Sequence, residues 1–233
     1  MNYVITPPTT PAILVAGEEN LFPVNRIYCV GRNYADHAIE MGHDPEREDP
    51  FFFKKSADNL LASSNLDGGN IFPYPSQTKE VHYEIELVVA LLNGGANIPI
   101  NMAVDYIWGF AVGLDLTRRD LQGEAKKTGR PWDTSKAFDH SAPIGRLHPI
   151  AETGSMENGR IWLAVNGDIQ QDANLNQLIW KIPELISYLS QLFTLKPGDL
   201  IFTGTPAGVG AIVKGDVVVG GIDGMSGIKI TVG

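Results

Sequence analysis

Apolar runs broken by turn-forming residues account for most of the chain. Residues 81–92 and 108–115 are long apolar runs that predict two buried strands. Between them, the run Asn93-Gly94-Gly95 is a turn signal. Shorter runs predict further strands at residues 27–30, 51–53, 161–165, 200–203, 217–219 and 228–232. The sequence therefore predicts a body built mainly of strands.

Helical periodicity is confined to a few segments. The strongest lies at residues 183–194, where apolar residues recur every three or four positions and Pro183 suits a helix start. Residues 34–41, preceded by Asn33 as an N-cap, and residues 116–127 predict two more helices. The fold class that follows is α+β, with mostly strands and three or four helices on the outside.

Length and composition limit the classes of protein that fit. With 233 residues the chain can form one large domain, and we expect residues 1–25 to be a small N-terminal appendage to residues 26–233. The formal net charge of −9 argues against a nucleic-acid or anionic-membrane partner. The longest apolar stretch, residues 107–114, is too short to span a membrane, and no signal-peptide pattern opens the chain. These features favour a cytoplasmic protein.

Two glutamates lie two residues apart inside the first long apolar run. Alternate residues of a strand point to the same face, so Glu84 and Glu86 should project together. Two carboxylates entering a buried sheet repel each other and are costly to desolvate, and a divalent cation would remove both costs. A pair of solvent-facing glutamates on an edge strand is the alternative, and the pattern alone leaves both open.

A third carboxylate, Asp115, closes the second long apolar run. It could be the N-cap of the segment that follows. It could also join Glu84 and Glu86 in a site made only of carboxylates. Such a ligand set favours Mg²⁺ or Mn²⁺, with Ca²⁺ as a further option, over Zn²⁺.

Two other groups could do proton or charge chemistry. His37 and Glu40 are three residues apart on the predicted helix, where a carboxylate can orient an imidazole for activating water. An exposed surface pair is the alternative. Lys136 lies between Trp132 and Phe138 and could be a partly buried lysine that stabilises an enolate or a carboxylate. The alternative is a surface lysine whose stem packs on the aromatic rings.

Residues 203–210 form a loop rich in Gly and Thr after a predicted strand. Such a loop can offer amides and hydroxyls to an anion. It lacks the Gly-Lys-Ser/Thr ending of a phosphate-binding loop, which argues against a nucleotide site.

Five segments, in this order, make the chain resemble the fumarylacetoacetate hydrolase family. They are residues 28–37 (YCVGRNYADH), 82–87 (HYEIEL), 113–122 (GLDLTRRDLQ), 135–138 (SKAF) and 198–206 (GDLIFTGTP). The resemblance extends over about residues 26–232. Within the family, residues 51–55 (FFFKK) and 129–136 (GRPWDTSK) are most similar to the fumarylpyruvate hydrolases of bacterial gentisate breakdown.

The resemblance implies a role for each candidate residue. It implies a mixed β-roll fold and a homodimer. The implied roles are metal ligands for Mg²⁺ or Mn²⁺ (Glu84, Glu86, Asp115), a water-activating pair on a lid (His37, Glu40) and groups around the keto-acid end of the substrate (Lys136, Arg119, Gln122, Thr205).

Two positions depart from the family pattern. Tyr83 stands where a second histidine is expected before the two glutamates, and its side chain should face away from them. Lys54-Lys55 stands where Lys-Pro is commoner, which could alter the substrate pocket.

The activity that the resemblance implies is hydrolysis of a carbon–carbon bond in a 2,4-dioxo acid during aromatic-compound catabolism. Fumarylpyruvate or a related acylpyruvate, a small-molecule keto acid, would give pyruvate and a carboxylic acid. Oxaloacetate decarboxylation or dienoate isomerisation on the same fold is the nearest alternative. A non-catalytic module that binds a cation is the other alternative.

Overall fold

A computed structural model describes residues 3–40, 48–62 and 70–233, although the side chains of residues 37–39 are not described. Its largest sheet has eight strands, and most pairs of neighbouring strands in this sheet are antiparallel. In spatial order these are β4 (Phe51–Lys55), β3 (Ile27–Gly31), β15 (Leu200–Phe202), β8 (Ile85–Leu91), β9 (Ile107–Leu114), β11 (Ala142–Ile144) and β5 (Leu60–Ala62), with β12 (His148–Pro149) also paired to β9.

Three smaller sheets complete the strands. One contains β14 (Asp168–Asn174), β13 (Arg160–Val165), β17 (Val217–Ile222), β18 (Ile228–Val232) and β6 (Asn70–Phe72). The others are β10 (Thr117–Arg118), β7 (Val81–Tyr83) and β16 (Gly210–Ile212), and the hairpin β1 (Ala12–Leu14) and β2 (Leu21–Pro23). Parallel pairs, such as β15 with β3 and β18 with β6, make the sheets mixed. The predicted strand-rich α+β class is confirmed.

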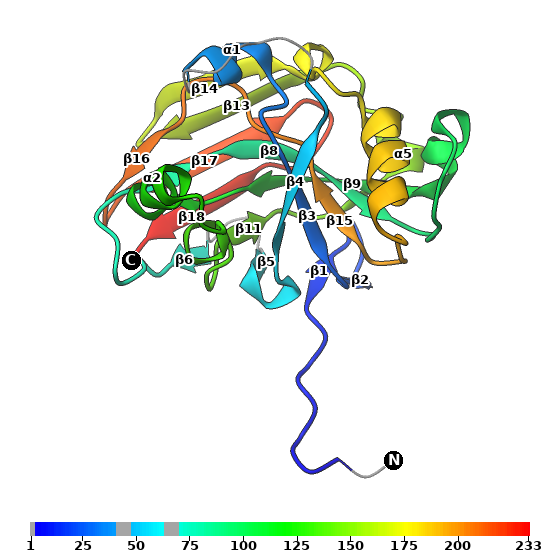
Figure 1. Cartoon of the computed structure of the whole chain (residues 1–233), viewed down its shortest axis with the longest axis horizontal. Helices are drawn as coiled ribbons and strands as arrows, with labels where there is room; N and C mark the ends of the chain where they lie inside the picture. The colour runs from blue at the N-terminus through cyan, green and yellow to red at the C-terminus, as the bar shows by residue number, and fades with distance from the viewer. Residues whose placement is uncertain (1–2, 41–47, 63–69) are drawn as a thin grey trace.

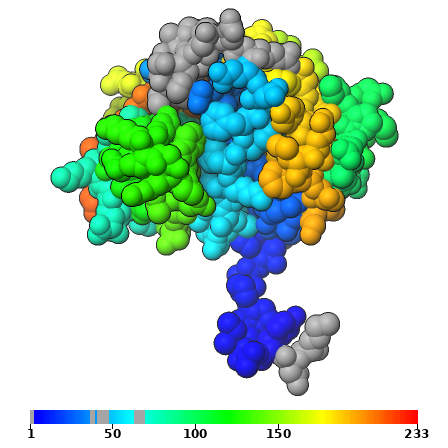
Figure 2. Space-filling view, in the orientation of Figure 1, coloured from blue at the N-terminus to red at the C-terminus, as the bar shows by residue number. Residues whose placement is uncertain are grey.

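The helices lie outside the sheets, with α2 and α5 on opposite sides of the view and α1 above (Figure 1). They are α1 (Ala35–Glu40), α2 (Arg119–Thr128), α3 (Asp133–Lys136), α4 (Ile150–Thr153) and α5 (Ile182–Leu192), with 3₁₀ turns η1 (Ala57–Asn59), η2 (Ile100–Tyr106) and η3 (Leu175–Gln177). The stretch before β1 extends away from the body (Figure 2). No helix in the described ranges is both long and apolar enough to cross a bilayer.

Strand β8 separates two parts of the core because its residues alternate between two faces. Ile85 and Leu87 pack into the larger cluster, which includes side chains of β9, β13, β18 and α5. Val88 and Ala90 pack into a second cluster with the hairpin strands and β15. Glu86 points to the same face of β8 as Val88 and Ala90. It lies near the start of the strand, and all residues that follow it in the strand are buried.

The long strand predicted over residues 81–92 is interrupted at Glu84, and its two halves belong to different sheets. The amide of Ile85 donates to the side-chain oxygen of Gln171 at 3.0 Å instead of to a strand neighbour. Gln171 is fully buried and donates in turn to Thr205 Oγ1 at 2.9 Å. A side chain distant in sequence therefore satisfies the backbone at this break, which no local pattern could indicate.

Asn33 was expected to be the N-cap of a helix, but its side chain bonds to the backbone of other segments instead. The α1 helix begins at Ala35, and the buried Asn33 amide donates to the carbonyls of Thr203 at 2.8 Å and Trp180 at 3.0 Å. Its oxygen accepts from the Trp180 amide at 2.7 Å. Asn33 therefore ties together the segments before α1, before α5 and after β15.

We expect Asn33→Ala to lower the free energy of unfolding by about 2–4 kcal/mol, because it leaves buried backbone groups without partners. Chemical denaturation measures the change. Asn176→Ala, at an exposed position in η3, serves as control and should change stability by less than about 0.5 kcal/mol. Equal effects of the two substitutions would contradict the role given to Asn33.

Candidate metal centre and substrate pocket

Three carboxylates meet where the ends of β8 and β9 lie side by side. Glu84, Glu86 and Asp115 each offer an oxygen, and these atoms lie within 4.8 Å of one another. Their exposed fractions are 5%, 2% and 1%. The structure therefore brings together the three acidic residues that the sequence separates by up to about thirty positions.

The strand register explains this convergence. Glu86 pairs with Gly113 across the two strands, and the Asp115 amide donates to the Glu84 carbonyl at 2.8 Å. Glu84 and Glu86 are buried, so the alternative of a solvent-facing pair is wrong. Asp115 is followed by β10, and α2 begins only at Arg119, so Asp115 is not a helix N-cap.

Cationic side chains neutralise two of the three carboxylates. Lys136 Nζ lies 2.7 Å from Glu84 Oε2 and 2.7 Å from Asp115 Oδ2. Lys55 Nζ lies 2.8 Å from Asp115 Oδ1, and Arg119 pairs with Glu84 Oε1. Desolvation lowers the pKa of Lys136, but the charges of Asp115 and Glu84 outweigh it and leave that pKa raised. Lys136 is 3% exposed, so the surface-lysine alternative is wrong.

Glu86 differs from its two neighbours because no ion pair within the described ranges reaches it. Its Oε2 accepts from the Gly204 amide at 2.8 Å. Desolvation, and then the charges of Asp115 and Glu84, raise the pKa of Glu86 well above its usual range. A buried carboxylate of this kind needs a nearby cation to ionise at neutral pH. The all-oxygen donor set fits a hard divalent ion, so the residues present fit a metal centre.

The hydrogen bond from the Gly204 amide to Glu86 requires a glycine for two reasons. Its φ of +101° lies in a region that side-chain-bearing residues rarely adopt, and a Cβ there would lie 2.7 Å from Asn33 Cβ. Glycine therefore lets the loop after β15 approach closely enough to place an amide on Glu86.

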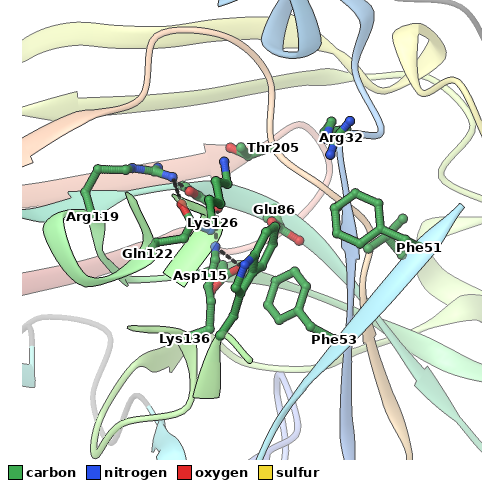
Figure 3. Close-up of a pocket in the computed structure, with 14 residues that line it drawn as sticks. Arg32, Phe51, Phe53, Glu86, Asp115, Arg119, Gln122, Lys126, Lys136 and Thr205 are labelled. Carbon is green, nitrogen blue, oxygen red and sulfur yellow. Dashed lines mark hydrogen bonds and ion pairs between the residues drawn. The ribbon is translucent and has the colours of Figure 1, made fainter. Parts of the chain in front are cut away.

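The residues implied for substrate binding line one pocket with the carboxylates (Figure 3). Arg119 Nη1 donates to Gln122 Oε1 at 2.6 Å, so the first turn of α2 holds both side chains together. Thr205 follows Gly204 in the loop, and Gln171 holds its hydroxyl. Tyr83 is buried in the larger core cluster and does not line this pocket, as expected.

The water-activating pair is only partly described. The backbone of His37 lies in α1, but its side chain is outside the described part of the structure. Both Glu40 carboxylate oxygens accept from the Gly208 amide, at 3.2 Å and 3.1 Å. Glu40 therefore contacts the loop that carries Thr205 and is not among the described residues that line the pocket.

Sequence reasoning missed several groups at the site. Lys55 was noted only as a departure from the family pattern, yet it is 2% exposed and pairs with Asp115. Its place in β4, two residues after apolar Phe53 and on the same face of the strand, was the available signal. Arg32 and Lys126 also line the pocket and were not singled out. Neither has a local pattern that distinguishes it from a surface cation.

We expect Glu86→Gln to raise the melting temperature of the metal-free protein at pH 7 and to abolish its stabilisation by Mn²⁺. Because the folded state raises this pKa, stability falls as the pH rises from the unfolded-state pKa through the folded-state pKa, and a neutral amide avoids that loss. A gain of about 1 kcal/mol in the free energy of unfolding would raise the melting temperature by roughly 2–4 °C. The difference between the metal-free proteins should vanish below about pH 4, where the carboxyl is protonated in both states.

Thermal melts with EDTA and with Mn²⁺ measure both effects. Glu124→Gln, at an exposed position on α2, is the matched control and should behave as wild type. An equal Mn²⁺ shift in wild type and Glu86→Gln would contradict a metal site at this carboxylate.

The chain is similar to several known proteins. The family model described as fumarylacetoacetate (FAA) hydrolase C-terminal matches residues 26–233. A fumarylpyruvate hydrolase of Ralstonia is 43% identical over 82% of this chain and 96% of its own length. A mitochondrial oxaloacetate decarboxylase of Dictyostelium discoideum is 40% identical over 86% of this chain and 89% of its own.

A crystal structure of fumarylpyruvate hydrolase from Pseudomonas aeruginosa, in complex with Mn²⁺ and pyruvate, superposes with a TM-score of 0.96. That chain is 49% identical, and the match covers 99% of each chain. The family model covers most of this chain, and these relatives are 40–49% identical over at least 82% of it, so the chain belongs to the fumarylacetoacetate hydrolase family.

Proposed function

We propose that this enzyme hydrolyses the carbon–carbon bond of an acylpyruvate, such as fumarylpyruvate, with Mg²⁺ or Mn²⁺. The observation that carries the proposal is the buried carboxylate of Glu86, which has no ion-pair partner among the described side chains and lies beside Glu84 and Asp115. Fumarylpyruvate hydrolases among its relatives, one of them in complex with Mn²⁺ and pyruvate, support the choice of substrate and metal. The pathway we infer is aromatic-compound breakdown through gentisate.

Glu84, Glu86 and Asp115 would hold the ion. A divalent ion bound there supplies Lewis acidity toward the carboxylate and the neighbouring keto oxygen of a 2-oxo acid. Arg119, Gln122 and Thr205 offer hydrogen bonds to the same end of the substrate from one side of the pocket. The substrate is thereby held with its second carbonyl carbon accessible to water.

The chain supplies the proton transfers. His37, oriented by Glu40, takes a proton from water, whose oxygen then bonds to the C4 carbonyl carbon. The C3–C4 bond breaks, and its electron pair leaves as the enolate of pyruvate. Lys136 stabilises the enolate charge, because its buried ammonium lines the pocket in which the enolate forms. The proton returns to C3, so fumarylpyruvate and water give fumarate and pyruvate.

Oxaloacetate decarboxylation is the second candidate. It is favoured by the decarboxylase relative at 40% identity and by chemistry that needs the same stabilised enolate of pyruvate. It requires no attacking water. The two reactions therefore differ in their need for a general base.

We expect Mn²⁺-loaded protein to turn over at least one of acetyl-, maleyl- and fumarylpyruvate, because the triad would hold the ion beside the substrate-binding residues. EDTA should abolish turnover, and added Mg²⁺ or Mn²⁺ should restore it. The loss of acylpyruvate absorbance and pyruvate release by a coupled assay measure the reaction. If neither metal restored turnover of any of the three, the proposal would be wrong.

We expect His37→Asn to lower kcat for acylpyruvate hydrolysis by at least about 100-fold, the usual contribution of a general base. Oxaloacetate decarboxylation should largely persist, since it needs no attacking water. Asp36→Asn, an exposed change on the same helix, is the control. Equal losses of both activities would show that His37 does not act as the base of hydrolysis alone.

A further inference from the structure

The side chains that line the pocket differ between its inner end and its mouth. The three carboxylates and Lys136 lie at the inner end, where they are buried, and the closed cavity itself is small, about 40 Å³. Phe51, Phe53 and Trp132 form one wall. In the view of Figure 3, Arg32 and Lys126 lie toward the top of the pocket, and Lys136 lies at its lower end. The aromatic wall, defined by these three rings, thus lies in the same pocket as two cations that the proposed mechanism does not use.

Among the described residues, Arg32 has a cation–π contact and one long ion pair. Its guanidinium carbon lies 5.0 Å from the centre of the Phe51 ring. Its contact with Glu48 Oε2 is 3.8 Å long, and the Glu48 side chain is 69% exposed, so solvent screens this pair. The φ of Arg32 is +56°, an unusual conformation for a residue with a side chain. A backbone of this kind at a pocket mouth is typical of positions that serve a site.

Lys126 is the second cation at the mouth. It lies in the last turn of α2, with its Nζ 5.3 Å from the centre of the Trp132 ring. Within the described ranges it has no ion pair with a carboxylate. Partial desolvation and the positive charges of Arg119 and Arg32 lower its pKa, so like charges gather here. An anion placed among them would relieve this repulsion.

The charge balance of the pocket supports an anionic ligand of more than one charge. Among the described residues that line it, four side chains are cationic (Arg32, Arg119, Lys126, Lys136) and three are carboxylates. With a divalent ion on the carboxylates the pocket would be strongly positive. The protein as a whole carries −9, so these local charges must attract the substrate.

We propose that Arg32 and Lys126 bind a second carboxylate at the far end of the acyl group, while the aromatic wall packs against a flat, unsaturated chain between the two ends. The enzyme therefore prefers acylpyruvates whose acyl group ends in a carboxylate. This inference rests on the proposed hydrolase function for its substrates. It assigns the preference to two side chains outside the metal centre.

Steady-state kinetics with fumarylpyruvate and acetylpyruvate test the assignment. Acetylpyruvate shares the reacting atoms and lacks the far carboxylate. We expect Lys126→Met and Arg32→Gln each to lower the ratio of kcat/KM for fumarylpyruvate to that for acetylpyruvate by about tenfold or more, the loss of a hydrogen bond to a charged group. Lys126→Arg should retain most of the ratio. Lys127→Met, at the exposed neighbouring position, should leave it unchanged.

An equal fall in kcat/KM for fumarylpyruvate and acetylpyruvate would overturn the assignment, because it would place these cations on the keto-acid end that both substrates share. An unchanged ratio in both variants would overturn it as well.

A binding measurement separates this inference from the proposed reaction. 2-Oxoheptanedioate and 2-oxoheptanoate have equal length and differ only in the far carboxylate, and neither has the 2,4-dioxo group that is cleaved. Mn²⁺-loaded wild type should bind the dicarboxylate about tenfold more tightly, and Lys126→Met should remove the preference. A preserved preference without acylpyruvate turnover would reject the reaction and keep the carboxylate site. Equal binding of the two acids to wild type would reject the site.

Discussion

Repulsion among three buried carboxylates is the constraint on which the rest of the site depends. Two like charges about 4 Å apart repel by roughly 4 kcal/mol near a protein surface, and by more when they are buried more deeply. Lys136, Lys55 and Arg119 offset the charges of Glu84 and Asp115. In the described part of the chain, Glu86 accepts from the Gly204 amide and has no ion pair, and burial beside Asp115 and Glu84 raises its pKa. Three cations therefore offset two of the carboxylates, and a divalent ion could offset the third.

The three carboxylates come together because one strand is interrupted at Glu84 and another ends at Leu114. The break at Glu84 lets the chain pass from one sheet to another, and the neighbouring strand ends just before Asp115. The loop after β15 then reaches over both strand ends because Gly204 and Asn33 pack closely together. The same loop offers Thr205 to the pocket and an amide to Glu40. This loop therefore both contacts Glu86, a proposed metal ligand, and carries Thr205, a proposed substrate-binding residue.

Sequence patterns predicted the strands and the candidate carboxylates because both depend on local features. Alternation placed Glu84 and Glu86 on one face, and an apolar run ending in Asp115 indicated a buried charge. Patterns failed where a distant side chain decides the local structure. Gln171 satisfies the backbone at the strand break, and Asn33 bonds to two other segments rather than to its own helix. Such contacts follow from the tertiary arrangement and leave no periodic signal.

The most direct test of this account is a crystal structure of the protein grown with Mn²⁺, with anomalous diffraction recorded at the manganese edge. The account predicts one strong anomalous peak in the pocket, within bonding distance of oxygens from Glu84, Glu86 and Asp115. Coordination of about 2.0–2.3 Å to oxygen ligands would be expected for a hard ion of this size. A pocket without the peak, or a peak that only one of the three carboxylates reaches, would contradict it.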